Sequence, residues 1–177
     1  LLGALLLYSG NDAATAIAEY VGGSEEAFVN MMNRRAQELM ANGTHFMNPH
    51  GLHDDNHYTT AYDLYLIFNE CIKHEDFVNI IQSEAYTAYY TDVDGNSQEV
   101  LFTPTNLYAQ GEVDVPENVT IVGGKTGTTD EAGYCLILME KDSSDNPYIS
   151  IVMGASEKPV LYEDMTSLIE AIPSGQQ

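Results

Sequence analysis

The chain has 177 residues, of which 44% are hydrophobic, and this length and composition are typical of one globular domain. It contains 27 Asp or Glu residues against six Lys or Arg, which gives a formal net charge of −21. Nucleic acids and anionic membrane surfaces are bound by clustered Lys and Arg, so this charge balance argues against both partners. No apolar run approaches the length that spans a bilayer.

The first half of the chain has the residue pattern of helices. Residues 1–8 are almost entirely apolar and predict a buried helix, which the cluster from Ser9 to Asp12 ends. Because this apolar run begins without a Met, we expect the chain to be part of a longer protein. Ser24 is a good N-cap for the longest helix. Further helices are predicted at residues 13–21, 25–41, 59–73 and 75–81.

The second half of the chain has the residue pattern of antiparallel strands. Strands at residues 86–91 and 98–102 flank Asp94-Gly95-Asn96, which is a hairpin signal. A run of helices followed by such strands predicts an α+β fold with an antiparallel sheet covered by helices. We expect a helical lobe over about residues 1–83 and a hairpin-plus-sheet part over about residues 84–177. Three more strands are predicted at residues 119–123, 133–141 and 148–155, followed by a helix at 160–172.

Lys125, Thr126 and Gly127 form a short motif in the second half. Lys125 is one of only six cations, and it stands among small residues at a predicted strand edge. A Lys in this setting can pair with a ligand carboxylate, to which Thr126 can donate a hydrogen bond. Gly127 leaves the strand edge open to an extended substrate backbone, and the backbone N–H of Thr128 is a donor for an oxyanion hole. The motif predicts a peptide-like substrate with a carboxylate.

Ser9, Gly10 and Asn11 form a second motif at the end of the first predicted helix. The Ser9 hydroxyl both donates and accepts hydrogen bonds, so it can pass on a proton. The Asn11 amide can pair with a peptide C=O and N–H of a substrate. Gly10 permits a turn tight enough to point both side chains the same way. Each motif alone is most often an ordinary turn, but the two together predict an acyl-transfer site.

The two motifs, in this order, resemble those of the D-alanyl-D-alanine carboxypeptidases, which are low-molecular-weight penicillin-binding proteins and serine peptidases. The resemblance implies a β-lactamase/DD-peptidase-like fold and an extracytoplasmic enzyme of the bacterial cell wall. It also implies a serine acyl-enzyme acting on peptidoglycan stem peptides that end in D-Ala-D-Ala, capture by β-lactams, and no metal or organic cofactor. Matching segments lie at residues 5–14, 48–52, 60–64, 124–129, 132–136 and 153–155.

The resemblance also implies roles for individual residues. Ser9 shuttles a proton, Asn11 holds the substrate amide, and Lys125 with Thr126 holds the terminal carboxylate. The family's nucleophile belongs to a Ser-x-x-Lys motif, and no such motif occurs in these 177 residues. We therefore expect this chain alone to be unable to form an acyl-enzyme. Family members also often carry an Arg beyond the last strand, where this chain has only Lys158.

Two alternatives follow from other features of the sequence. The missing Ser-x-x-Lys motif fits a non-catalytic domain that binds peptidoglycan stems or β-lactams. Four His residues and two Asp residues within residues 45–57 fit a metal-binding module, although their spacing matches no common zinc pattern. Cys71 and Cys135 lie far apart in apolar stretches, which favours free buried thiols and leaves a disulfide between them open.

Overall fold

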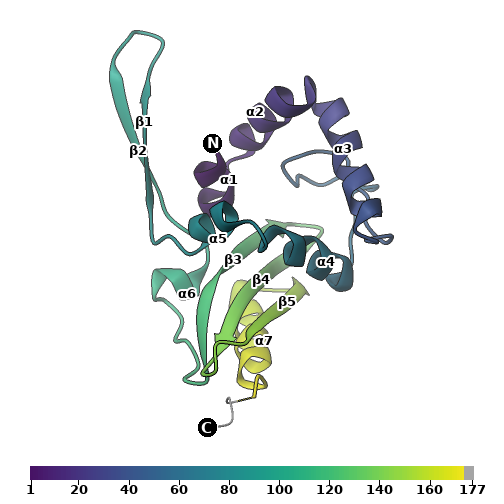
Figure 1. Ribbon diagram of the computed structural model, residues 1–177, viewed down its shortest axis with the longest axis vertical. Helices are drawn as coiled ribbons and strands as arrows, with labels where there is room; N and C mark the ends of the chain where they lie inside the picture. Colours follow the sequence, from purple (N-terminus) through teal and green to yellow (C-terminus); the bar gives the residue numbers. More distant parts are fainter. Residues whose placement is uncertain (174–177) are drawn as a thin grey trace.

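The computed structural model describes residues 1–173 of an α+β fold built on a three-stranded antiparallel sheet (Figure 1). The strand order is β3-β4-β5, so that β3 is an edge strand and β4 is central. Helix α7, Lys158–Glu170, covers one face of this sheet, and α4, Ala61–Cys71, and α5, Glu75–Ile81, contact the other. The strands are β3 at Val119–Thr129, β4 at Gly133–Asp142 and β5 at Pro147–Ala155.

Strand β4 is apolar on both of its faces, and this pattern explains why it lies between two layers of helices. Leu136 and Leu138 pack with Met165 and Ile169 of α7, and all four side chains are buried. Because successive strand residues point to opposite faces, Met139 packs on the other side, in a cluster with two helical residues, Phe68 and Ile81. The sheet is therefore the shared wall of two hydrophobic cores.

The helices of the first half form an arc that begins beside the sheet and returns to it (Figure 1). Two of them begin at a side-chain cap, of which the cap at Ser24 was predicted and the cap at Thr60 was not. Ser24 Oγ accepts a hydrogen bond from the N–H of Ala27 at 3.2 Å, and Thr60 Oγ1 accepts one from Asp63 at 3.1 Å. The helices are α1 at Leu2–Tyr8, α2 at Asn11–Gly22, α3 at Glu25–Glu38, α4 at Ala61–Cys71 and α5 at Glu75–Ile81.

A two-stranded hairpin, β1 at Tyr86–Thr91 and β2 at Ser97–Phe102, projects from the body of the molecule (Figure 1). Its base lies against α1, where the ring of Tyr8 is 5.9 Å from that of Phe102. The chain then returns to the sheet through α6, a short helix at Leu107–Gln110. The sequence predicted the hairpin but not α6, whose four residues are too few to show a periodic pattern.

Three predictions about the elements need correction. Helix α1 is not buried all round, because Leu2 is 53% exposed and only Gly3 and Leu7 are buried. The predicted helix at 25–41 ends at Glu38. Strand β3 does not stop at Gly123 but continues to Thr129, so Lys125 lies within the strand. The end of the predicted sheet part, residues 174–177, lies outside the described residues.

Two general expectations about the chain can be examined over residues 1–173. No helix in this range is both long enough and apolar enough to cross a membrane. Cys71 and Cys135 are free and half-buried, so the structure contains no disulfide between them. The prediction of free, buried thiols is thus correct in that both are free, but they are only half-buried. Burial raises the pKa of the Cys71 thiol, which disfavours the reactive thiolate form.

Candidate active site

The junction between α1 and α2 is a tight turn that carries Ser9 and Asn11. Ser9 has left-handed backbone angles of φ 61° and ψ 39°, which are uncommon for a residue with a side chain. The N–H groups of Ser9 and Gly10 donate to carbonyls of the last turn of α1, at 3.2 and 3.1 Å. Gly10 then caps α2, and Asn11 is the first residue of that helix. The turn thus fixes Ser9 and Asn11 on either side of Gly10, at the junction between the two helices.

Strand β3 brings Lys125 to the same junction. Lys125 Nζ donates a short hydrogen bond to Ser9 Oγ and a second one, of 2.7 Å, to the carbonyl oxygen of Thr126. Because Ser9 Oγ accepts from the ammonium group, the hydroxyl proton of Ser9 is left to donate to another group. The two sequence motifs, 116 residues apart, are therefore joined directly by their side chains.

The predicted residues Ser9, Asn11, Lys125, Thr126, Gly127 and Thr128 all line one cleft, with a volume of about 760 Å³. The cleft runs along the edge strand β3, whose outer edge pairs with no other strand of residues 1–173. A Cβ added at Gly127 would meet no atom within 4 Å, so its methyl-sized space is part of the open cleft. An extended peptide can therefore lie beside this part of β3 and pair with its backbone.

The cleft is cationic, although the chain as a whole is strongly acidic. Burial lowers the pKa of Lys125 from its ordinary value to about 8. At neutral pH most Lys125 side chains are still in the charged ammonium form, which can bind a carboxylate. Lys158, at the start of α7, lines the same cleft and is exposed. Two of the six cations of the chain thus face one cleft.

A loop between α3 and α4 contributes to the lining of the cleft. Asn48 holds the loop from both sides: its Oδ1 accepts from the N–H of Gly51 at 2.7 Å, and its Nδ2 donates to the carbonyl of Leu52 at 2.8 Å. Gly51 has a positive φ of 83°, which few other residues adopt. This turn places His50 and Leu52 at the cleft. The resemblance to known sequences had marked this loop without assigning it a position.

Several cleft residues escaped the sequence analysis. Most of them come from segments that carry no motif, although Tyr134 and Cys135 lie in the matching segment at residues 132–136, which had been given no role in the site. Thr105 lies between the hairpin and α6, and its Oγ1 is 2.5 Å from Thr126 Oγ1. Tyr134 and Cys135 of β4, with Leu161 and Tyr162 of α7, complete the lining. No local spacing rule could have identified Thr105, Leu161 and Tyr162, because the other cleft residues lie far from them in sequence.

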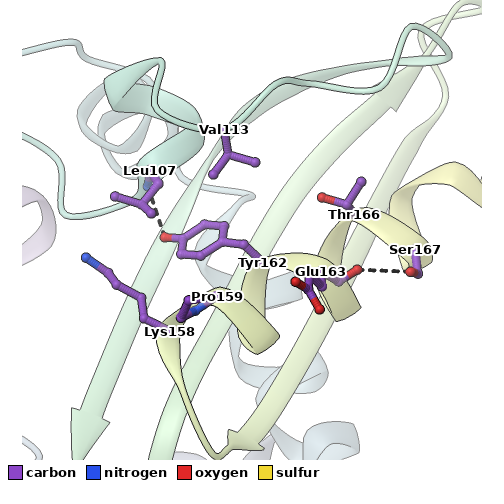
Figure 2. Close-up of a pocket in the computed structure, with 8 residues that line it drawn as sticks. All are labelled: Leu107, Val113, Lys158, Pro159, Tyr162, Glu163, Thr166 and Ser167. Carbon is purple, nitrogen blue, oxygen red and sulfur yellow. Dashed lines mark hydrogen bonds between the residues drawn. The ribbon is translucent and has the colours of Figure 1, made fainter.

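A second cavity, of about 610 Å³, lies between α7 and the segment that carries Leu107 and Val113 (Figure 2). The ring of Tyr162 lies among the residues that line this cavity. Its hydroxyl accepts a hydrogen bond of 2.9 Å from the N–H of Leu107. Lys158 and Tyr162 line both this cavity and the cleft. The same two residues of α7 therefore separate the two spaces.

The His and Asp side chains of residues 45–57 are not clustered in the way that a metal site requires. Within residues 1–173, no group of three or more His, Cys, Asp or Glu side chains is arranged to hold a metal ion. The imidazoles make other contacts instead. His45 Nδ1 bonds the carbonyl of Asn56 at 2.7 Å, and His57 Nδ1 accepts from the N–H of Met47 at 3.2 Å. The pKa of His57 is lowered mainly by burial, so the charged form is disfavoured. It is the arrangement of the side chains in residues 1–173, and not the pKa of His57, that argues against the metal-binding alternative.

Comparison with known proteins identifies the class of this fold and then the family. The structure superimposes on the crystal structure of a Streptomyces DD-transpeptidase with a TM-score of 0.85 and 27% identity, covering 96% of this chain and 64% of that one. The fold is thus that of the DD-peptidases. The family model described as D-alanyl-D-alanine carboxypeptidase matches residues 1–157. The chain belongs to the D-alanyl-D-alanine carboxypeptidase family, as its motifs suggested.

Curated relatives agree with this assignment. A D-alanyl-D-alanine carboxypeptidase of Bacillus subtilis, DacF, is 33% identical over 172 residues, which cover 96% of this chain and 41% of that protein. A D-alanyl-D-alanine carboxypeptidase of Escherichia coli, DacA, is 34% identical over 148 residues, covering 84% of this chain and 33% of that protein. The chain therefore spans about two-fifths or less of the length of these relatives.

Proposed function

We propose that the cleft is the substrate-binding half of a serine-type D-Ala-D-Ala carboxypeptidase that acts on peptidoglycan stem peptides. The observation that carries this proposal is the direct contact between Ser9 and Lys125 beside an open strand edge. The ammonium group of Lys125, with the hydroxyl of Thr126, binds the terminal carboxylate. The amide of Asn11 pairs with the substrate backbone, which lies along β3 at Gly127.

In the proposed reaction, a serine hydroxyl gives up its proton to the relay that includes Ser9, and its oxygen attacks the carbonyl of the penultimate D-Ala and forms an ester. The C–N bond to the terminal D-Ala breaks, and Ser9 passes a proton to the leaving amine. The backbone N–H of Thr128 stabilises the oxyanion, and water then hydrolyses the ester. With a pKa of about 8, Lys125 can exchange protons with Ser9 near neutral pH. β-Lactams would be captured by the same serine as stable esters.

The nucleophile of this reaction is not among these 177 residues, since they contain no Ser-x-x-Lys motif. We propose that the chain binds substrate without forming an acyl-enzyme unless such a motif is supplied. This feature also keeps a second function open, that of a non-catalytic domain that binds peptidoglycan stems or β-lactams. In either case the ligand places the protein outside the cytoplasm, in the cell envelope or secreted.

Binding of a short peptide tests the proposal on this chain directly. We expect an N-acylated peptide ending in D-Ala-D-Ala to shift the amide NMR signals of Lys125–Thr129 and of Ser9 at pH 7. We also expect binding to weaken above pH 8, by up to about tenfold per pH unit, as Lys125 loses its charge. Lys125→Met should weaken binding about tenfold or more, because it removes a charge-assisted hydrogen bond.

The matched control is Lys141→Met, which removes a cation on β4 that pairs with Asp145 at 3.0 Å, away from the cleft lining. This variant should bind the peptide as the unmodified chain does. A peptide ending in L-Ala-L-Ala should bind more weakly, because its methyl groups point to the opposite sides of the backbone. Equal binding of the two peptides, or equal losses in the two variants, would overturn the proposed site.

A further inference from the structure

The segment at residues 104–110 connects three parts of the cleft, and we call it the bridging segment. The N–H of Thr105 donates to the carbonyl of Leu7 at 3.2 Å, in the last turn of α1 before Ser9. Leu107 donates its N–H to Tyr162 Oη of α7 (Figure 2). Within the segment, Gln110 Nε2 donates to the carbonyl of Pro104 at 2.7 Å. The bridging segment is therefore held to α1 at one point and to α7 at another.

The bridging segment also contacts β3, through the side chain of Thr105. Thr105 Oγ1 and Thr126 Oγ1 are 2.5 Å apart, a short hydrogen bond between two hydroxyl groups. Thr126 is the neighbour of Lys125, whose ammonium group donates to the Thr126 carbonyl. Thr105 lines the cleft itself, but its hydroxyl is directed to Thr126. The hydroxyl of Thr105 thus fixes the position of the Thr126 hydroxyl in the cleft.

The chemistry of the ligand determines which of the two hydroxyls donates. Each hydroxyl has one proton, and an ionised carboxylate only accepts hydrogen bonds. When Thr126 donates its proton to a carboxylate, it has none left for Thr105. Thr105 must then be the donor, and its hydrogen bond polarises the Thr126 hydroxyl and strengthens the next bond in the chain.

We infer that Thr105 is a positioning residue, which orients and polarises the Thr126 hydroxyl toward the substrate carboxylate. This inference rests on the proposed function for the identity of the ligand, but the orienting contact exists without it. The sequence gives no sign of this role, because Thr105 stands 21 residues from its partner and in no motif. The role belongs to the bridging segment, which carries Thr105 between α1 and α7.

The first test uses the chain without ligand. Thr105→Val keeps the shape of the side chain and removes its hydroxyl, whereas Thr105→Ser keeps the hydroxyl. Three-bond NMR couplings should show one χ1 rotamer for Thr126 in the unmodified chain and in Thr105→Ser, and averaging over rotamers in Thr105→Val. Thermal unfolding of each variant shows that it is folded. Averaging of Thr126 in the unmodified chain, or no change in Thr105→Val, would overturn the inference.

The second test measures affinity for the N-acylated D-Ala-D-Ala peptide. Thr105→Val should bind it about three- to tenfold more weakly, and Thr105→Ser should bind within about twofold of the unmodified chain. In a Thr126→Val background, Thr105→Val should cause no further loss, because the only route from Thr105 to the ligand has gone.

Equal losses in Thr105→Val and Thr105→Ser would mean that the methyl group matters and not the hydroxyl, which overturns the inference. A further loss in the Thr126→Val background would also overturn it, since Thr105 would then act on the ligand independently. If the unmodified chain fails to bind the peptide while its Thr126 shows one rotamer that Thr105→Val releases, the proposed function fails and the positioning contact stands.

Discussion

Gly124→Ala should destabilise the fold by roughly 3 kcal/mol, which corresponds to a fall in Tm of about 6–12 °C. Gly124 pairs with Leu138 of the central strand. A Cβ at this position would lie far inside contact distance of the Ile137 carbonyl oxygen and 2.7 Å from Leu138 Cδ2. The carbonyl belongs to the central strand and cannot move without disturbing both cores. Thermal unfolding followed by circular dichroism measures the effect.

Gly127→Ala is the matched control for this prediction, because it adds the same methyl group three residues further along β3. No atom lies within 4 Å of a Cβ at Gly127, so its Tm should change by less than about 2 °C. Its affinity for the D-Ala-D-Ala peptide should nevertheless fall, because the methyl group occupies space at the open strand edge. Equal losses of stability in the two variants would contradict the structure of β3.

Glu140→Gln should make the protein more stable at neutral pH. Glu140 lies in β4 with no exposed surface, and neither carboxylate oxygen has a hydrogen-bond partner among the described residues. Burial raises the pKa of this carboxyl to about 7, although the nearby Ser150 opposes part of the rise. A buried ionised carboxylate is costly, and the amide of Gln removes the charge at a similar volume.

The sign of the pH dependence follows from the direction of this shift. Between about pH 4.5 and pH 7, the folded protein keeps a proton on Glu140 that the unfolded chain has released. The contribution of Glu140 to stability therefore falls as the pH rises through this window, and it stays low above pH 7. The full loss is on the order of 3 kcal/mol.

Urea unfolding at pH 4.5, 6, 7 and 8 measures this contribution as the difference between Glu140→Gln and the unmodified chain. The difference should grow from pH 4.5 to pH 7 and then level off. Glu140→Met, which removes the polar atoms, should show the same trend. Glu84→Gln, at an exposed position, should show no such growth. A constant difference across the four pH values would show that Glu140 is not a buried, titrating carboxyl.

Sequence patterns predicted those elements whose signals are local. Helix α5 and strand β1 have the predicted ends, because the helical period marks the first and the turn at Asp94-Gly95-Asn96 indicates the second. Strand β3 was predicted too short, since Gly123 and Gly124 look like a turn. The structure gives these glycines another role: a Cβ at Gly123 would collide with the Ile81 carbonyl, and one at Gly124 with that of Ile137. Because these glycines have no side chains, the backbone of β3 can pack closely against those two carbonyl groups, and no local sequence pattern reveals such a contact.

The residues of the candidate site also fall into two groups, those that sequence motifs predict and those that only the folded structure identifies. Ser9, Asn11, Lys125 and Thr126 belong to motifs whose chemistry can be predicted from the sequence, and the fold brings them into one cleft. Thr105 could not be predicted, because its contribution depends on contacts with α1, β3 and α7 at once. The burial of Glu140 could not be predicted either, since a charged residue near the end of a strand is usually exposed.

Intact-mass spectrometry after incubation with penicillin tests the central claim, that this cleft completes a serine acyl-enzyme. The 177-residue chain is compared with a longer chain that carries the family's Ser-x-x-Lys segment ahead of Leu1. We predict a penicillin adduct on the folded longer chain only, lost when the serine of that motif is changed to Ala and slowed at least tenfold by Lys125→Met. An adduct on the 177-residue chain itself, or none on a folded longer chain, would contradict the account.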